Sequence, residues 1–316
     1  MSKRIIKLFF IIMIVLCLAG CISHEQTEDI IIMYTNDVAG ELNGELGIAN
    51  VKGYKNYLMT ENNYVTLVDA GDYFDGNLSK IDGGGNIVKV MNAVGYDVVA
   101  LGNQEFSIGL ENLANNIDNS DFDYISCNLK YTGSGKDPLK KVKPYVIKKY
   151  GWTKVAYIGV TTPETTIPGK SSYEAILKDG KLLYGFYEEN EGQDLYEQVQ
   201  KNVNKVRKKV DYVVVLAHLG SNSVSEGFSS YDLIENTEGI DVVIDGHSHT
   251  VIHGEPVNNR NGDTVVLTST GHELENFGVL YMHPDHTFTT TLYPSSYETD
   301  LDVQALVDSI YEAAGK

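Results

Sequence analysis

Five short apolar runs, each followed within five residues by a side chain that can bind a divalent metal, constrain this chain more than any other feature. The runs occupy residues 30–34, 65–68, 98–101, 212–216 and 242–244, and the polar residues after them are Asp37, Asp72, Asn103, His218, and the pair His247 and His249. Short β-branched runs bounded by Gly, Asn and Asp are typical of buried strands. Ligands of open α/β sheets gather beyond the carboxyl ends of the strands. The pattern therefore predicts an α/β fold in which these polar side chains converge on a metal site.

Helical patterns alternate with these runs. The apolar spacing predicts helices over residues 86–94, 110–117, 195–210 and 302–314, and Gly95 is expected to end the first of them. Further strands are expected at residues 154–160, 264–268 and 279–282. Because the chain has no internal repeat and no low-complexity segment, we expect a large mixed sheet system rather than a repeat array.

The composition is that of a globular protein with an acidic surface. The 316 residues are 42% hydrophobic, and 25 Lys and Arg stand against 43 Asp and Glu, a formal net charge of −18 at pH 7. A chain of this size buries a sizeable core, as one large α/β domain or two small ones. Its charge excludes attraction to a nucleic-acid duplex by bulk electrostatics.

The first 21 residues differ in composition from the rest of the chain. A basic start precedes an uninterrupted apolar stretch at residues 8–18, and the sequence LAGC closes the segment at Cys21. This pattern is typical of a secretory leader with a lipoprotein box. We therefore expect a signal segment at residues 1–21, a lipid anchor on Cys21, a tether at residues 22–29 and the folded domain at residues 30–316. An uncleaved anchor helix is the alternative, although the run is shorter than the roughly 20 residues that span a bilayer.

Both interpretations of the leader place the domain outside the cytoplasm. The expected location is the outer face of the cytoplasmic membrane, with a secreted or periplasmic protein as the variant. Beyond the leader, Cys127 is the only cysteine, which excludes a disulfide framework. Cys127 lies in a strand-like segment and is expected to be a small core residue.

The blocks that end the apolar runs resemble, in order and local sequence, the metallophosphoesterase (calcineurin-like phosphoesterase) domain of the 5'-nucleotidase family. The blocks are residues 34–40 (YTNDVAG), 69–72 (DAGD), 101–106 (LGNQEF), 217–220 (AHLG) and 245–249 (DGHSH). Residues 143–147 (KPYVI) and 158–164 (IGVTTPE) are similar to the same family. The resemblance covers about residues 30–290.

The resemblance implies a four-layer α/β/β/α sandwich, in which two mixed sheets are flanked by helices, and a centre of two divalent metals such as Zn or Mn. By position, the bridging carboxylate would be Asp72. The first ligand group would be Asp37, Asp72 and His249, and the second would be Asp72, Asn103, His218 and His247. Two cations of this kind clamp a phosphate group and lower the pKa of a bound water.

The chain departs from the family at Ala39. The family has Asp-x-His in its first block, and its His ligates the first metal, whereas Ala39 stands at that position. A water could fill the gap, or Glu41 or His272 could supply a ligand. We therefore expect the first ligand group to bind its metal more weakly than the second.

A second departure concerns catalysis. The family has Asn-His-Glu-Phe-Asp in its third block, and the chain has Asn103, Gln104, Glu105, Phe106 and Ser107. The family's His steadies the phosphate and helps the leaving group, and its Asp orients that His. A carboxamide donates a hydrogen bond but delivers no proton at neutral pH. Nucleotides, whose leaving group needs a proton, should therefore be hydrolysed more poorly than aryl phosphates.

Family members commonly continue into a second domain that stacks the nucleobase, and this chain ends at Lys316. We expect that substrate domain to be absent, so a partner chain could supply specificity. Two functions remain. The first is an extracytoplasmic, metal-dependent phosphohydrolase for a phosphorylated small molecule, such as a nucleotide, that is weakened by Ala39 and Gln104. The second is a non-catalytic lipoprotein of the same descent that binds a metal or a phosphorylated ligand.

Overall fold

The computed structural model describes residues 26, 28–44, 46–221, 227–294 and 297–315. The expected signal segment, its Cys21, and residues 22–25 and 27 of the expected tether lie outside this part of the chain. Within the described residues, the longest and most apolar helices still fall short of what crossing a membrane requires.

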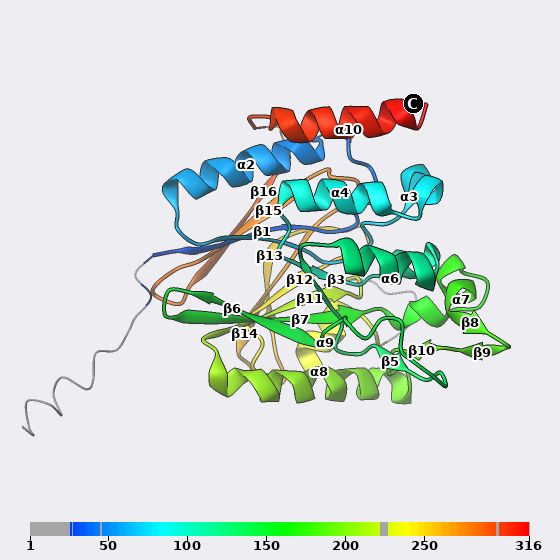
Figure 1. The fold of residues 1–316 in the computed structure, drawn as a ribbon. Coiled ribbons are helices and arrows are strands. Elements are labelled where there is room, and N and C mark those ends of the chain that lie inside the picture. The colour runs from blue at the N-terminus through cyan, green and yellow to red at the C-terminus, as the bar shows by residue number, and fades with distance from the viewer. Residues whose placement is uncertain (1–25, 27, 45, 222–226, 295–296, 316) are drawn as a thin grey trace, which may run out of the picture.

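Two six-stranded sheets form the centre of the molecule (Figure 1). The first sheet has the order β16-β15-β1-β2-β3-β4. Its strands are β1 (Ile30–Thr35), β2 (Val65–Asp69), β3 (Val98–Ala100), β4 (Asp123–Ile125), β15 (Phe277–Met282) and β16 (Phe288–Tyr293). Strands β1 to β4 are parallel, and β15 and β16 add an antiparallel edge.

The second sheet repeats this arrangement, with the order β13-β14-β12-β11-β7-β6. Its strands are β6 (Tyr145–Tyr150), β7 (Thr153–Thr161), β11 (Tyr212–His218), β12 (Val242–Asp245), β13 (Val251–Asn258) and β14 (Thr264–Thr270). The four inner strands are parallel and the two edge strands are antiparallel. Two small ribbons add β5 (Lys130–Tyr131) with β10 (Tyr184–Gly185), and β8 (Leu177–Lys178) with β9 (Lys181–Leu182).

Alternation along the strands builds three cores. On β1, Ile31 and Met33 join the core beneath the first helical layer, whereas Ile32 and Tyr34 join the core between the sheets. Strand side chains point to opposite faces in turn, so a run that is apolar at every position must be covered on both sides. Tyr34 also links the sheets through a 2.7 Å hydrogen bond between its hydroxyl and Thr268 Oγ1.

Helices cover both outer faces and complete four layers, as the resemblance implies (Figure 1). The first layer holds α2 (Ile48–Glu61), α3 (Gly76–Asp82), α4 (Gly85–Val94), α6 (Leu110–Asn119) and α10 (Leu301–Ala313). The second sheet is covered by α8 (Gln193–Val206) and α9 (Ser230–Asn236). The shorter helices are α5 (Gln104–Ser107), α7 (Ser171–Ile176), η1 (Pro163–Thr166), η2 (Asn190–Gly192) and η3 (Arg207–Lys209).

Local chemistry explains where several helices end. Gly95 ends α4 with a left-handed φ of 83°, as predicted. The prediction that one helix runs from residue 195 to 210 was wrong at its end, because α8 stops at Val206 and a 3-10 turn follows. Arg207 in that turn donates to Asp241 Oδ2 at 2.5 Å, which ties the turn to the start of β12. Cys127 is buried and free, as expected, and burial raises the pKa of its thiol to about 12.

Candidate metal centre

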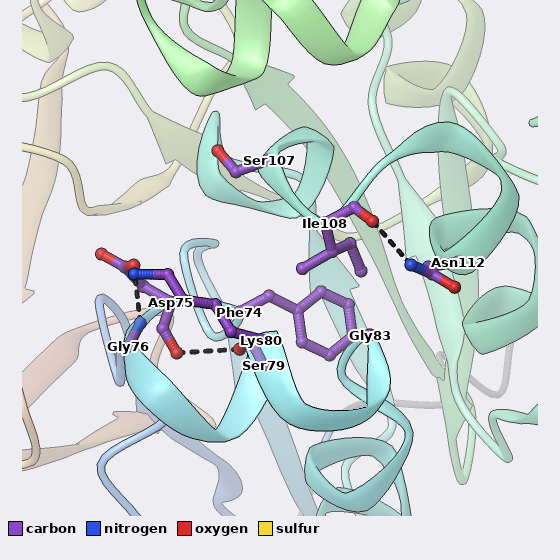
Figure 2. Close-up of a pocket in the computed structure, with 9 residues that line it drawn as sticks. All are labelled: Phe74, Asp75, Gly76, Ser79, Lys80, Gly83, Ser107, Ile108 and Asn112. Atoms are coloured by element: carbon purple, nitrogen blue, oxygen red, sulfur yellow. Dashed lines mark hydrogen bonds between the residues drawn. The ribbon is translucent and has the colours of Figure 1, made fainter.

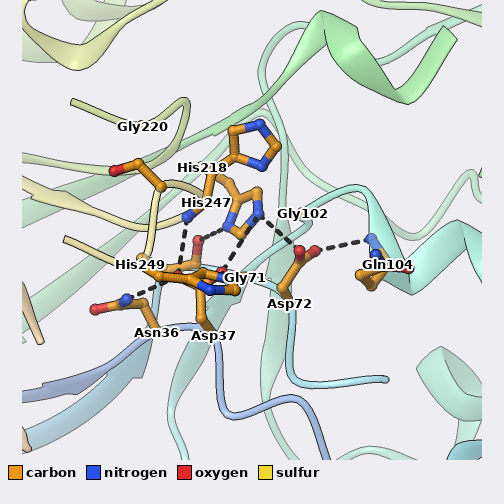
Figure 3. A network of polar contacts seen from close by, with 12 residues as sticks. Asn36, Asp37, Gly71, Asp72, Gly102, Gln104, His218, Gly220, His247 and His249 are labelled. Carbon is orange, nitrogen blue, oxygen red and sulfur yellow. Dashed lines mark hydrogen bonds and ion pairs between the residues drawn. The ribbon is translucent and has the colours of Figure 1, made fainter. Parts of the chain in front are cut away.

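The five predicted runs form β1, β2 and β3 of the first sheet and β11 and β12 of the second. These are inner, parallel strands, so their carboxyl ends lie along one edge of each sheet. Register aligns the ends further, since Thr35 pairs with Asp69 and Ala217 pairs with Asp245. The structure brings the loops that follow these strands together where the two sheets face each other (Figure 3).

Asp72, His218 and His247 form the tightest group of candidate ligands. One ligand atom from each lies within 4.8 Å of those of the other two. His218 Nε2 is 3.0 Å from Asp72 Oδ2, and His218 Nδ1 is 2.9 Å from the Ala70 carbonyl oxygen, which fixes the ring. Carboxylate and imidazole at this spacing suit Zn, Mn and similar divalent ions.

Asp37 and His249 lie on the other side of His218 (Figure 3). His249 Nε2 is 3.6 Å from Asp37 Oδ1, and His218 Nε2 is 3.9 Å from the same oxygen. Asp37 Oδ2 accepts hydrogen bonds from Asn36 Nδ2 at 2.7 Å and from the His247 backbone N–H at 2.9 Å. These donors hold the carboxylate so that Oδ1 faces the imidazoles.

Three buried atoms of the predicted ligand set have no hydrogen-bond partner, namely Asp37 Oδ1, Asn103 Oδ1 and His218 Nε2. Nearly all buried polar atoms in proteins are paired, so each of these atoms needs an explanation. Carboxylate oxygen, amide oxygen and imidazole nitrogen are all ligands of Zn and Mn. The residues present therefore fit a centre for divalent cations.

Four of the six predicted ligands have a strained backbone. Asp37, Asp72, His247 and His249 have φ values of 50°, 59°, 83° and 56°, in the left-handed region that side chains rarely adopt. Each such residue costs about 1–3 kcal/mol and persists only where the surroundings enforce it. Strain at four of the six predicted ligands indicates that their directions are set by function rather than by local preference.

Two glycines let the loops approach closely. Gly71 has a φ of 101°, and a Cβ there would lie 2.8 Å from His218 Nδ1. A Cβ on Gly102 would collide with Asp72 Oδ1. The glycines beside Asp72 and Asn103 are therefore required by the packing of the ligand loops against one another.

The electrostatics of the centre depend on the histidine between the two carboxylates. Burial alone would lower the pKa of His218, but Asp72 and Asp37 outweigh it and raise the pKa to about 10. Burial raises the pKa of Asp37, and the charge of Asp72 adds to that effect. Without a metal, a proton on His218 thus offsets the repulsion between two buried carboxylates.

Glu105 braces the Asp72 loop, a role that the sequence did not reveal. Its fully buried carboxylate accepts hydrogen bonds from the backbone N–H groups of Asp72, Tyr73 and Phe74 at 3.0–3.1 Å, and from that of Gly102 at 2.6 Å. One side chain thus joins the loops after β2 and β3. The only signal in the sequence was a Glu directly inside a ligand block.

Glu164 is a second residue that the sequence did not assign. Its Oε2 lies 3.1 Å from His247 Nε2, and it belongs to η1, which follows β7. A carboxylate on one ring nitrogen fixes the orientation of a histidine and directs the other nitrogen elsewhere. Glu164 therefore orients His247 within the group.

The two residues considered as substitutes near Ala39 differ in their surroundings. Glu41 Oε1 accepts a hydrogen bond from the Tyr311 hydroxyl at 3.1 Å. His272 stacks on His249, with ring centroids 4.8 Å apart and an angle of 4° between the planes. The lone pair of an imidazole nitrogen lies in the plane of its ring. The lone pairs of two stacked, parallel rings therefore do not converge on one metal ion. In this conformation His272 supports His249 by stacking, and its Nδ1 is buried without a hydrogen-bond partner.

Gln104 and Ser107 remain a pair. Ser107 Oγ donates to Gln104 Oε1 at 2.7 Å and lies 2.8 Å from Ser171 Oγ. The Gln104 backbone N–H donates to Asp72 Oδ1 at 2.8 Å. Positions 104 and 107 thus keep a side-chain pairing, in a neutral form.

A cavity of about 220 Å³ lies beside this pair (Figure 2). Phe74, Asp75 and Lys80 line it from the side of α3, and Ser107 and Asn112 line it from the side of α5 and α6. The cavity is small compared with the roughly 300–1,000 Å³ of pockets for drug-sized ligands. It has room for a compact polar group next to Ser107.

Comparison with known proteins finds relatives over most of the chain. The family model described as bacterial capsule synthesis protein PGA_cap matches residues 62–273. Snake venom 5'-nucleotidase of Gloydius brevicauda is 30% identical over 246 residues, which are 72% of this chain and 38% of that protein. The chain thus spans well under half the length of that relative.

Solved structures agree on the fold. The 5'-nucleotidase precursor of Thermus thermophilus superimposes with a TM-score of 0.76 at 22% identity, covering 90% of this chain and 59% of that one. The calcineurin-like phosphoesterase YfkN of Bacillus subtilis gives 0.71 at 22% identity, covering 91% and 98%. The chain therefore belongs to the family of the bacterial capsule synthesis protein PGA_cap, among the metal-dependent phosphoesterases that include the N-terminal domain of 5'-nucleotidases.

Proposed function

We propose that this chain is an extracytoplasmic, metal-dependent hydrolase of small phosphate monoesters. The observation that carries the proposal is the gathering of candidate ligands around Asp72 at the carboxyl ends of five strands from two sheets, three of them with a buried atom that has no hydrogen-bond partner. Surface carboxylates gather by chance, whereas buried polar atoms without a partner and residues with a left-handed backbone are both uncommon, and Asp37 shows both features.

Asp37 and His249 would hold one cation, Asn103, His218 and His247 would hold the other, and Asp72 would bridge them. When bound, two divalent cations polarise the phosphate and activate the attacking water. Glu105 keeps Asp72 in place through the loop backbone, and Glu164 leaves Nδ1 of His247 to face the centre.

Gln104 limits the reaction. Its carbonyl oxygen is engaged by Ser107, so its amide N–H groups can donate to a phosphate oxygen. It has no proton to give to an alkoxide leaving group, and a general acid contributes about 10² to 10⁴ in rate. The proposed substrates are therefore esters whose leaving group needs little protonation, or whose organic part is compact enough for the cavity beside Ser107.

The proposed location follows from the leader. The basic start, the apolar stretch and the LAGC sequence support export and lipid attachment at Cys21. One relative of the chain is named as a venom 5'-nucleotidase, and venom is a secretion.

Hydrolysis of p-nitrophenyl phosphate by the purified chain, with Mn or Zn added, tests the proposal. We expect metal-dependent turnover that falls about 10³-fold or more in Asp72→Asn, since both cations lose their shared ligand. Asp302→Asn, an exposed carboxylate in the first turn of α10, is the matched control and should retain full activity. Turnover no higher than that of Asp72→Asn would leave the non-catalytic binding function.

A further inference from the structure

The end of the molecule opposite the metal centre carries an exposed aromatic residue. Trp152 is the only tryptophan of the chain and lies in the turn between β6 and β7, with 62% of its surface exposed. Lys149 Nζ lies 5.1 Å from the centroid of its ring. Tryptophan is enriched where proteins meet the membrane interface, because its ring is apolar and its N–H is polar.

Exposed lysines surround this turn, although the chain as a whole has a net charge of −18. They are Lys149, Lys154, Lys208 and Lys209. The last two sit in η3, directly before β11, whose Tyr212 pairs with Val155 of β7. The acidic side chain between them, Asp211, accepts a hydrogen bond from the Lys154 backbone N–H at 2.7 Å. Asp285 lies between two further residues that line the Trp152 cavity, so the four lysine ammonium groups outnumber the two carboxylates at its rim.

The start of the described chain lies at the same end. Gln26 and Trp152 line one cavity of about 260 Å³. Gln26 is held there, since its Nε2 donates to the Met282 carbonyl oxygen at 2.7 Å and its Oε1 accepts from the Tyr212 hydroxyl at 3.3 Å. Gln26 lies five positions after Cys21, and five steps of extended chain reach at most about 17 Å.

We infer that the Trp152 end of the domain docks on an anionic lipid bilayer, with Trp152 at the interface and the lysines above the headgroups. The inference rests on the proposed attachment at Cys21, which would hold this end within about 17 Å of the bilayer and give docking a high effective concentration. Each lysine near an anionic surface strengthens binding roughly fivefold.

Docking in this way sets the direction of the metal centre. The β1 and β11 strands run from the Trp152 end to the ligand loops (Figure 1). Seven strand residues span about 23 Å, so the centre would face away from the bilayer. Soluble substrates would reach it without crossing the headgroup region.

The test uses the full chain reconstituted into phosphatidylglycerol-containing liposomes, with and without brominated acyl chains. Bromine quenches only indole that enters the bilayer interface, and the single Trp152 makes the signal unambiguous. We expect blue-shifted, strongly quenched emission, and a loss of quenching in Lys149→Glu/Lys154→Glu. Lys178→Glu/Lys181→Glu, which changes the same charge on the β8–β9 ribbon, should leave quenching unchanged.

Flotation of the liposomes separates the two proposals. A chain that floats with the liposomes but shows no bromine quenching would overturn the docking and leave the anchor intact. A chain that does not float would overturn the anchor and the docking with it. Quenching that persists equally in Lys149→Glu/Lys154→Glu would contradict the proposed role of the lysines.

Discussion

The second ligand group is enclosed, whereas the first is open on one side. His218 of the second group is 0% exposed and lies 3.0 Å from Asp72. His249 of the first group is 54% exposed and lies 3.6 Å from Asp37. Ala39 offers no ligand to the first predicted group, while Asn103 of the second predicted group has a buried Oδ1 without a hydrogen-bond partner. Both predicted groups include Asp72, and the residues of both lie at or follow the carboxyl ends of inner strands. The difference in exposure therefore arises in the loops and not in the sheets.

This contrast shows which part of the centre the fold protects. Glu105 braces the loop of Asp72, the proposed bridging residue, and Glu164 braces His247 of the second group, so this geometry exists before any metal binds. The first group relies on an exposed imidazole that is steadied by its stack on His272. We therefore expect one tight and one weak metal, and a reaction limited at Gln104.

The largest expected effect is a gain of function. Gln104→His/Ser107→Asp would restore an imidazole that can donate a proton, and a carboxylate to orient it, at two positions that already pair. Hydrolysis of nucleoside monophosphates should rise about 100-fold or more, and that of aryl phosphates far less, because only the alkoxide needs a proton. Comparing kcat for the two substrates checks this, and equal gains on both would contradict it.

Removing the hydrogen bonds that the Glu105 carboxylate accepts should lower the free energy of unfolding. In Glu105→Gln the amide group would face two of the four backbone N–H groups that the carboxylate now satisfies. Unsatisfied buried donors cost about 1–3 kcal/mol each, so unfolding free energy should fall by about 2–4 kcal/mol. Urea unfolding measures this. Glu111→Gln, exposed on α6, serves as the control, and equal stability of the two variants would refute the role of Glu105.

Adding a histidine ligand to the first group should reduce the difference in metal affinity between the two groups. Ala39 already has a left-handed φ of 51° and donates its N–H to the Asp72 carbonyl oxygen at 2.9 Å, so the backbone at this position is held in place. Ala39→His should tighten the weaker metal about tenfold or more, as ligand-shell changes commonly do, and leave the tighter one unchanged. Competition with a chromophoric chelator measures both constants.

The pH dependence of metal binding should follow His218. Its pKa is raised to about 10 in the metal-free protein, and a ligating imidazole must be neutral. At lower pH the proton competes, so affinity at the second group should rise by up to tenfold per pH unit between pH 6 and 8. Calorimetric titration across this range checks the slope, and an affinity independent of pH would argue against His218 as a ligand.

Much of the fold could be predicted from sequence because its strands are buried on both faces. Runs such as 212–216 stand out as continuous apolar segments, and parallel strands place their carboxyl ends along one edge. Helix ends were harder to predict. The helix α8 ends before Arg207, and the Asp241 carboxylate that Arg207 contacts is distant in sequence. Helix α2 and the β13 edge strand gave no clear pattern, because their polar and apolar residues are mixed.

The candidate ligands could be predicted because each directly follows a strand. Their supports could not. Glu105 acts on backbone N–H groups, which carry no sequence signal, and Glu164 meets His247 only after β7 and β12 are placed in one sheet. The stack of His272 on His249 likewise depends on how β14 ends beside β12.

Stepwise titration of the metal-free chain with Mn or Zn, followed by calorimetry, tests the central claim most directly. The account predicts two binding events that differ at least tenfold in affinity, with the tighter one lost in His218→Ala and the weaker one lost in His249→Ala. Two equally tight sites, or a tighter site that survives His218→Ala, would contradict it.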